Sequence, residues 1–215
     1  MSALAGATDP GRYHPSSAIR QYLAAAGRGA PTRDLLAAAV HERWAVKTAA
    51  DPDAEALTNQ VPREGTIQAL SALPVPPLLP PNGRSEGAEK TLWSVEATLT
   101  AYRAEADGDY HMVIADQSGR TMIAEIPKPA DIVGQSYFAD GIAEARRTFD
   151  DHFQIAENPA TPTLPGVSVS TFREVSVEVR LVGLGFFDFG HDQRGVAPNA
   201  IELHPVVNVV FTPSH

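Results

Sequence analysis

The chain has 215 residues, of which 43% are hydrophobic and 20% are charged, and its formal net charge is −9. It contains no cysteine, which excludes disulfides, thiolate metal sites, iron–sulfur clusters and cysteine nucleophiles. No run of about 18 apolar residues occurs, and Met1 to Ala30 lacks the basic start and continuous apolar core of a secretory signal. We therefore expect a soluble, cytoplasmic protein that does not associate with a membrane.

Three segments precede the β-rich part of the chain. Residues 1–15 are rich in Gly, Pro and Ala without periodicity, which predicts a disordered N-terminus. Residues 16–73 form a predicted helical extension, and residues 74–90 contain a run of prolines that predicts a stiff linker. The helical patterns are residues 18–26, residues 33–48 and a short stretch capped by Thr66. This extension packs on the rest of the chain, on a second copy in a homo-oligomer, or on another protein.

The remaining residues, 91–215, alternate between apolar and polar side chains in several stretches. Such a period of two indicates half-buried strands, whereas apolar residues at i, i+4 and i+7 indicate a helix. The predicted strands are residues 92–102, 110–114, 121–126, 175–181 and 201–211, with a helix over residues 138–153. Asp107-Gly108 and Asp116 to Gly119 supply hairpin turns, and Pro205 predicts an edge or a bulge. Three strands, a helix and two strands make the order of the OB-fold, so we predict a mainly β (α+β overall), OB-fold-like five-stranded barrel.

The predicted barrel carries the whole excess of negative charge. Residues 1–90 contain nine basic and nine acidic side chains, whereas residues 91–215 contain eight basic and seventeen acidic ones, a difference of −9. Proteins that bind nucleic acid without sequence specificity use Lys and Arg to neutralise phosphates. We therefore expect no measurable non-specific affinity for nucleic acid.

Several residues of the types that bind metals lie on the outward face of the predicted sheet. Strand alternation places Glu96, His111, Glu125 and His204 there, and Asp188 and His191 follow the fourth strand. A site with His111, Asp188, His191 and His204 as ligands would hold zinc or manganese, and Glu125 would be the general base of a hydrolase. The alternative is that these are unrelated, solvated surface groups.

Two further segments are candidate binding sites. Tyr110 and His111 follow the Asp107-Gly108 turn, and an aromatic side chain there could stack on a ligand; the alternative is a hairpin turn with Tyr110 in the core. The loop from Gly195 to Pro205 could present Asn199 and His204 rigidly. Its alternative is that Gly195 and Asn199 supply tight-turn geometry while His204 hydrogen-bonds the neighbouring loop.

Four strings resemble those of an uncharacterised family of bacterial proteins with an OB-fold-like barrel. They are Asp109-Tyr110-His111, Thr121 to Pro127, Gly185 to Phe189 and Gly195 to Pro205, and the resemblance covers roughly residues 91–212. The family has no assigned activity, so the resemblance implies a fold and no catalytic residue. In topology alone the barrel is also similar to the staphylococcal-nuclease type, but at the exit of the third strand only Glu125 resembles that type's acidic loop.

The sequence favours a non-catalytic OB-fold-type binding protein, whose partner is an unknown protein or small molecule. The first alternative is a metal-dependent hydrolase of phosphodiesters or other esters, with a divalent metal as cofactor. The second alternative is a single-stranded nucleic-acid-binding protein.

Overall fold

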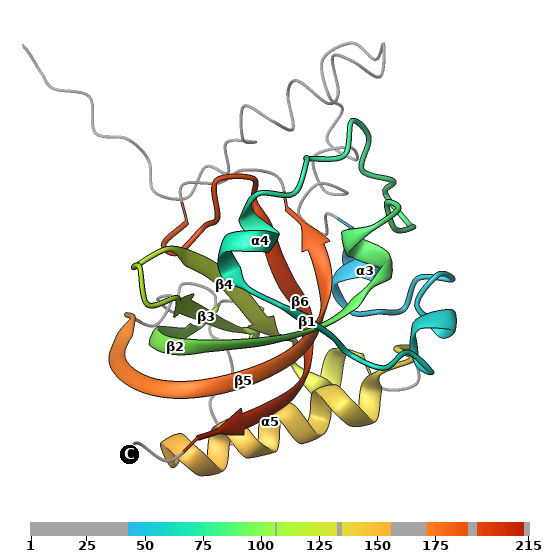
Figure 1. Cartoon of the computed structure of the whole chain (residues 1–215). Helices are drawn as coiled ribbons and strands as arrows, with labels where there is room; N and C mark the ends of the chain where they lie inside the picture. Colours follow the sequence, from blue (N-terminus) through green and yellow to red (C-terminus); the bar gives the residue numbers. More distant parts are fainter. Residues whose placement is uncertain (1–42, 106, 133–134, 156–170, 189–192, 213–215) are drawn as a thin grey trace, which may run out of the picture. The chain divides into compact units, whose positions relative to one another are not determined.

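The computed structural model describes residues 43–105, 107–132, 135–155, 171–188 and 193–212. These residues are mainly β, with six strands in one mixed sheet and a few helices, an α+β arrangement (Figure 1). The strands are β1 (Arg63–Gly65), β2 (Leu92–Ala104), β3 (Tyr110–Ala115), β4 (Thr121–Ile126), β5 (Arg173–Phe187) and β6 (Ile201–Phe211). The α-helices are α3 (Trp44–Lys47), α4 (Ile67–Ser71) and α5 (Ala139–Phe153). Single 3-10 turns are η1 (Glu55–Leu57), η2 (Ala88–Lys90) and η3 (Pro129–Asp131).

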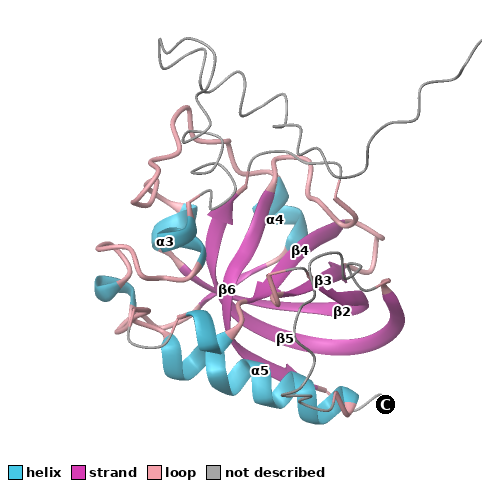
Figure 2. Ribbon diagram, turned by 180° about the vertical axis from the view of Figure 1, so that it is seen from behind, coloured by secondary structure: helices cyan, strands magenta, loops and turns pink. Residues whose placement is uncertain are grey.

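When the strand pairings are followed around the sheet from β2, they lead back to β2. β2, β3 and β4 form an antiparallel meander, β4 pairs in parallel with β6, and β6 pairs antiparallel with β5. β5 then pairs antiparallel with β2, from Leu92 opposite Leu184 to Tyr102 opposite Arg173. The order β2-β3-β4-β6-β5-β2 is therefore a closed circuit, and Figure 2 shows these strands curving around a common centre.

The sixth strand is one that the sequence pattern did not predict. β1 pairs in parallel with the start of β2, from Arg63 opposite Trp93 to Gly65 opposite Val95. β3 covers the same edge of β2 only from Thr98 onward, so β1 covers backbone groups that would otherwise form an unpaired edge. A strand of three residues is too short to show alternation. The prediction of five strands was wrong for this reason.

The two predicted hairpin turns are present. Gly108 has a φ of 91° and Gly119 a φ of 82°, values that favour glycine because it has no Cβ. In the second turn the side chain of Asp116 accepts hydrogen bonds from the amides of Ser118 at 2.8 Å and Arg120 at 3.0 Å. These turns set the register of the meander and so decide which side chains share a face.

Helix α5 covers one side of the sheet and supplies Phe149, one of the largest fully buried side chains. Ile142, Ala145 and Phe149 lie on one face of α5 and are at most 1% exposed. The ring of Phe149 is 5.0 Å from the rings of Tyr102 and Tyr110. In Figures 1 and 2 the helix runs beneath β5 and β6. Its bounds confirm the helix predicted over residues 138–153, between the third and fourth predicted strands.

Two buried ion pairs hold the segment before β2 together, and one of them also attaches it to the sheet. Arg43 donates to both oxygens of Glu89, at 2.6 and 2.8 Å, and the two side chains are 2% and 0% exposed. Glu89 also accepts from the amides of Ser85 and Phe187 at 2.7 and 2.9 Å. The second pair joins Arg84 to Asp51 at 2.9 Å. Because Phe187 belongs to β5, this network fixes residues far apart in the chain.

The predicted N-terminal elements fall largely outside the described residues. The helix over residues 18–26 and most of the helix over residues 33–48 lie there, as does the expected disordered N-terminus. The short helix after Thr66 is confirmed as α4, whose first turn is capped by the Thr66 hydroxyl accepting from the Ala69 amide at 3.1 Å. The described residues belong to one compact unit, Glu42–His215, and contain no helix long and apolar enough to span a membrane.

Candidate functional site

A cluster of titratable side chains lies on the face of β3, β4 and β6 that points away from the apolar core. His111 of β3 is paired in register with Glu125 of β4, and Ala124 with Leu203 of β6, so His204 lies beside Glu125. We define the His/carboxylate cluster as five residues that are each at most 5% exposed. They are Asp109, His111, Glu125, Glu202 and His204.

Glu125 is the central member of this cluster. One of its oxygens is 3.0 Å from Nδ1 of His111, and the other is 3.1 Å from Nδ1 of His204. His204 Nδ1 is also 3.2 Å from an oxygen of Glu202. The second ring nitrogen of His111 is 3.0 Å from the carbonyl oxygen of Arg194. Three strands thus meet at the Glu125 carboxylate, and the loop before β6 contacts His111.

A bulge in β6 positions His204. The pairing with β5 shifts between Gly183 opposite Val206 and Gly185 opposite Leu203, so β6 has one extra residue at His204-Pro205. A Cβ at Gly183 would lie 3.0 Å from the carbonyl oxygen of Pro205, and only glycine allows this close approach without a shift. The bulge predicted from Pro205 is confirmed.

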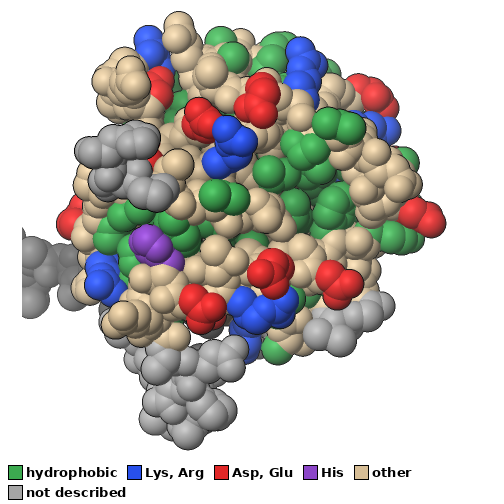
Figure 3. Space-filling view, turned by 60° about the horizontal axis from the view of Figure 1, so that its bottom comes forward, with side chains coloured by type: hydrophobic (Ala, Val, Ile, Leu, Met, Phe, Trp, Pro, Cys, Tyr) green, Lys and Arg blue, Asp and Glu red, His purple; other side chains and the backbone are tan. Residues whose placement is uncertain are grey.

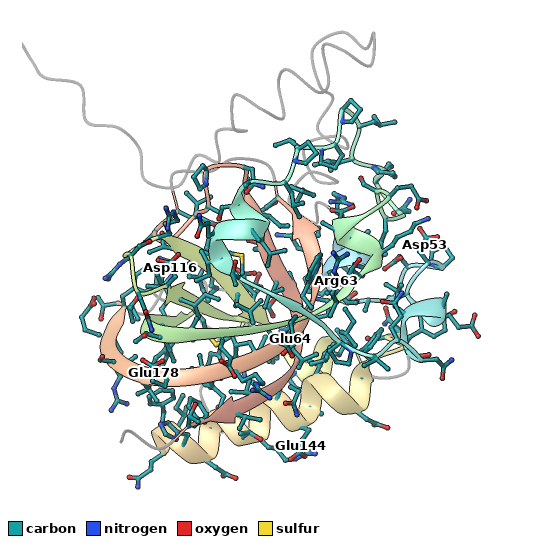
Figure 4. The ribbon with its side chains drawn as sticks, in the orientation of Figure 1. Asp53, Arg63, Glu64, Asp116, Glu144 and Glu178 are labelled. Atoms are coloured by element: carbon teal, nitrogen blue, oxygen red, sulfur yellow. The ribbon has the colours of Figure 1, made fainter. Side chains whose placement is uncertain are left out.

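The surroundings of the cluster shield it from water. The ring of Phe186 is 5.6 Å from that of His204, and the guanidinium of Arg43 lies 4.8 Å from the Phe186 ring. The ammonium of Lys47 is 5.3 Å from the same ring and 3.6 Å from Asp188. By contrast, carboxylates such as Glu144 and Glu178 lie at the periphery of the ribbon (Figure 4). The cluster therefore differs from the solvated surface groups that were the alternative for these residues.

Burial and mutual contact move the pKa values of the carboxyl groups apart. Burial acts to raise the pKa of Glu125, but the charge of His204 and the hydrogen bond with His111 outweigh it and lower this pKa to about 2. Burial and the adjacent Glu125 raise the pKa of Glu202 well above its usual range. Burial, opposed by His204, raises the pKa of Asp109 to about 6. Glu125 is thus the ionised member of a group of carboxyls that compete for positive charge.

The pKa values of the two histidines are also shifted in opposite directions. Burial lowers the pKa of His204 despite the attraction of Glu125. Burial also acts to lower the pKa of His111, but its hydrogen bond and charge interaction with Glu125 prevail and raise that pKa. Neutral imidazole is the form that binds metal ions, and His204 is the histidine whose environment favours it.

The structure brings together only part of the predicted site. His111, Glu125 and His204 meet, and Asp188 follows β5 beside Lys47. His191 lies outside the described residues. Glu96 is an exposed residue of β2 that pairs with Arg180. Tyr110 lies on the core side, where its hydroxyl donates to Asp150 at 2.6 Å.

Asn199 stabilises the chain around α4. Its amide donates to the carbonyl oxygens of Leu70 at 2.9 Å and Leu73 at 3.0 Å. We expect Asn199→Ala to lower the free energy of unfolding by about 1–2 kcal/mol, because the hydrogen bonds of the side chain to Leu70, Leu73 and Ile201 are lost. Urea denaturation would measure this change. The same substitution at Asn208, an exposed residue of β6, is the control and should stay within about 0.5 kcal/mol; equal effects at both positions would contradict the structural role.

The sequence interpretation missed two members of the cluster. Asp109 directly follows the Asp107-Gly108 turn, and its carbonyl oxygen accepts from the Glu105 amide at 2.8 Å. Glu202 was not among the predicted site residues. Its signal was its spacing of two residues from His204, which puts both side chains on one face.

Comparison of the sequence with protein-family models and with curated proteins gave no match. The contacts, burial and charges of the His/carboxylate cluster are therefore the basis on which a function is argued.

Proposed function

We propose that this chain is a non-catalytic OB-fold-type binding protein that takes a small cationic ligand at the His/carboxylate cluster. The closed order β2-β3-β4-β6-β5 supports the fold part of this proposal, as does the parallel pairing of β4 with β6. The position of α5 between β4 and β5 agrees with it. These are the strand order and helix position expected of a five-stranded, Greek-key OB barrel.

The observation that carries the binding proposal is the burial of three carboxyl groups around two imidazoles. Asp109, Glu125 and Glu202 are at most 5% exposed, and burying ionisable groups costs free energy unless they are paired. Only Glu125 has a strongly lowered pKa, whereas those of Asp109 and Glu202 are raised. The cluster thus has more carboxyl groups than its own cations keep ionised, and a cationic ligand would supply the missing positive charge.

The geometry favours binding over hydrolysis. A general base works best with a pKa near the operating pH, but the pKa of Glu125 is lowered to about 2. Both Glu125 oxygens are also within 3.1 Å of a histidine nitrogen. Glu125 is therefore better suited to hold positive charge in place than to accept a proton from water.

The charge distribution also disfavours nucleic acid as the ligand. The cluster is rich in carboxyl groups, which repel phosphates. On the face shown in Figure 3, acidic and basic side chains lie next to one another around apolar patches. Binding to a phosphate backbone depends instead on a continuous basic surface.

A panel of cations tests the proposal. We expect at least one of Mg²⁺, Ca²⁺, Mn²⁺, Zn²⁺ and spermidine to raise the melting temperature of the full chain by about 5–10 °C when present at about 100 times its dissociation constant. Glu125→Gln should abolish the shift, since it removes the central negative charge but keeps the shape and can still hydrogen-bond His111.

The control is Glu96→Gln, the same substitution at an exposed position of β2, which should leave the shift unchanged. Shifts of equal size in all three proteins would show that cations bind elsewhere. Hydrolysis of bis(p-nitrophenyl) phosphate by the wild type, lost in Glu125→Gln, would instead support the hydrolase.

A further inference from the structure

We infer that the cluster binds one divalent transition-metal ion through Asp109, Glu125 and His204. This inference rests on the proposed function and narrows its ligand from a small cation to a metal. One donor atom from each of these residues can be chosen so that all three lie within 4.8 Å of one another. The three residues come from the turn before β3, from β4 and from β6, so the site would join three separate strands of the sheet.

The observation that points to a bound ligand, beyond the presence of acidic residues, is a buried ring nitrogen of His204. Its Nε2 atom is buried, in a residue that is 1% exposed, and has no hydrogen-bond partner within the described part of the chain. Leaving such an atom unsatisfied costs about 1–3 kcal/mol. The nearest carboxylate oxygen, Oδ2 of Asp109, is 3.9 Å away, too far for a hydrogen bond. Two ligands of one metal ion can be separated by such a distance.

The other ring nitrogen of His204 is held as in known metal-ligating histidines. Nδ1 lies 3.1 Å from Glu125 and 3.2 Å from Glu202. A carboxylate at Nδ1 fixes the proton on that nitrogen and leaves the lone pair of Nε2 for a metal. Glu202 is then the outer partner that orients His204. The contact of Glu125 with Nδ1 is a charge contact at 3.1 Å, whereas Glu202 makes the hydrogen bond, so Glu125 is left to act as a ligand of the metal.

The side chain of Asp109 is fixed in a similar manner. Its Oδ1 accepts from the amide of Lys128 at 2.8 Å, and its own amide donates to Asp107 at 3.1 Å. Oδ2 is the oxygen that faces His204. The turn thus presents one oxygen of Asp109 to the proposed site while the other holds the loop.

A second group with the same residue types lacks an unpaired histidine nitrogen within the described residues. Glu105, His111 and Glu125 also lie close together, but both ring nitrogens of His111 are engaged, by Glu125 and by the carbonyl of Arg194, each at 3.0 Å. The ring is also edge-on to Phe172 at 5.4 Å. We therefore assign the metal to His204 and an orienting role to His111.

The donor set selects the class of metal. One imidazole and two carboxylates suit Zn²⁺, Mn²⁺ or Fe²⁺. Ca²⁺ requires six to eight oxygen ligands, more than these buried residues offer. The ammonium of Lys47, a nearby cation, is 3.6 Å from Asp188.

Metal titration of the untagged full chain tests the inference. After dialysis against EDTA, the protein should bind Mn²⁺ or Zn²⁺ with a stoichiometry of one by calorimetry, and Co²⁺ should give visible absorption bands. Asp109→Asn, which is nearly isosteric, and His204→Gln should each weaken binding by about 100-fold or more, since loss of an outer partner alone costs about 10–100-fold. Glu105→Gln, in the rejected group, should bind as the wild type does.

Folding of each variant is checked by its urea midpoint in EDTA, and either of the two ligand variants suffices for the test. Wild-type affinity in Asp109→Asn or His204→Gln, or loss of binding in Glu105→Gln, would overturn the assignment. If spermidine stabilises the wild type but not Glu125→Gln while no metal binds, the metal inference is wrong and the proposed function stands. If neither binds, both are wrong.

Discussion

Replacing Glu89 with glutamine is expected to lower the free energy of unfolding by about 3–5 kcal/mol at pH 7, the usual cost of removing one partner of a buried ion pair. Arg43 would keep its hydrogen bonds to the carbonyl oxygens of Pro80, Gly83 and Phe187. Its charge, however, would stay buried without the carboxylate that now accepts two bonds from it. Urea denaturation followed by circular dichroism would measure the loss.

Glu86→Gln is the matched control for Glu89→Gln. Glu86 pairs with Lys90 on the surface and its side chain is 87% exposed, so its replacement should cost no more than about 1 kcal/mol. A loss of similar size in both variants would show that the Arg43 network adds no more stability than a surface pair.

The pH dependence of the stability difference between wild type and Glu89→Gln tests whether the charge of Glu89 causes it. Burial acts to raise the pKa of Glu89, but the hydrogen bonds and charge of Arg43, with the amides of Phe187 and Ser85, lower it below 4.5. A carboxyl whose folded pKa is lowered stabilises the protein above its unfolded pKa, and this stabilisation is lost as pH falls through the folded pKa. The gap between wild type and Glu89→Gln should therefore be constant near neutrality and narrow in acid. A gap independent of pH would exclude the ion pair as its source.

Phe149→Ala should destabilise the protein by a similar amount, about 3–5 kcal/mol. Phe149 is 0% exposed and its ring contacts Tyr102 and Tyr110 at 5.0 Å. Truncation leaves a cavity between α5 and the sheet that these rings cannot fill without leaving their rotamers. The midpoint of urea unfolding should fall while the slope of the transition stays constant.

Arg147→Ala is the control on the same helix. Arg147 is on the exposed side of α5, with 63% of its side chain accessible, and its loss should change stability by about 0.5 kcal/mol or less. Wild-type stability in Phe149→Ala would mean that α5 does not close the core.

Local patterns in the sequence predicted the mainly β, α+β character of the fold because most of its strands and helix α5 are long and periodic. Alternation over β2, β3, β4 and β6 placed His111, Glu125 and His204 on one face, and the strand order then brought β4 beside β6. Alternation states only that these side chains point away from the core. It does not state whether water or protein lies above them, so their burial could not be predicted.

Patterns of this kind do not predict contacts between residues that are far apart in the sequence. Arg43 and Glu89 are 46 positions apart, and the helical pattern over residues 33–48 does not indicate what the Arg43 side chain contacts. Their bidentate contact depends on how the chain before β2 folds back onto Phe187. Residues 74–90 were predicted as a linker from their prolines, yet Arg84, Ser85 and Glu89 within them are buried. Composition describes the backbone of such a stretch better than it describes what its side chains contact.

The Arg43–Glu89 pair also bears on how far this protein can be shortened. A truncated version starting at β2 would retain all the strands of the closed circuit, and a domain boundary drawn at the prolines would suggest it. Such a fragment would lose Glu89, which caps the end of β5 through the Phe187 amide, and β1, which covers the first edge of β2. The smallest fragment that keeps these contacts begins no later than Arg43, so crystallisation or NMR work on a minimal unit should start there.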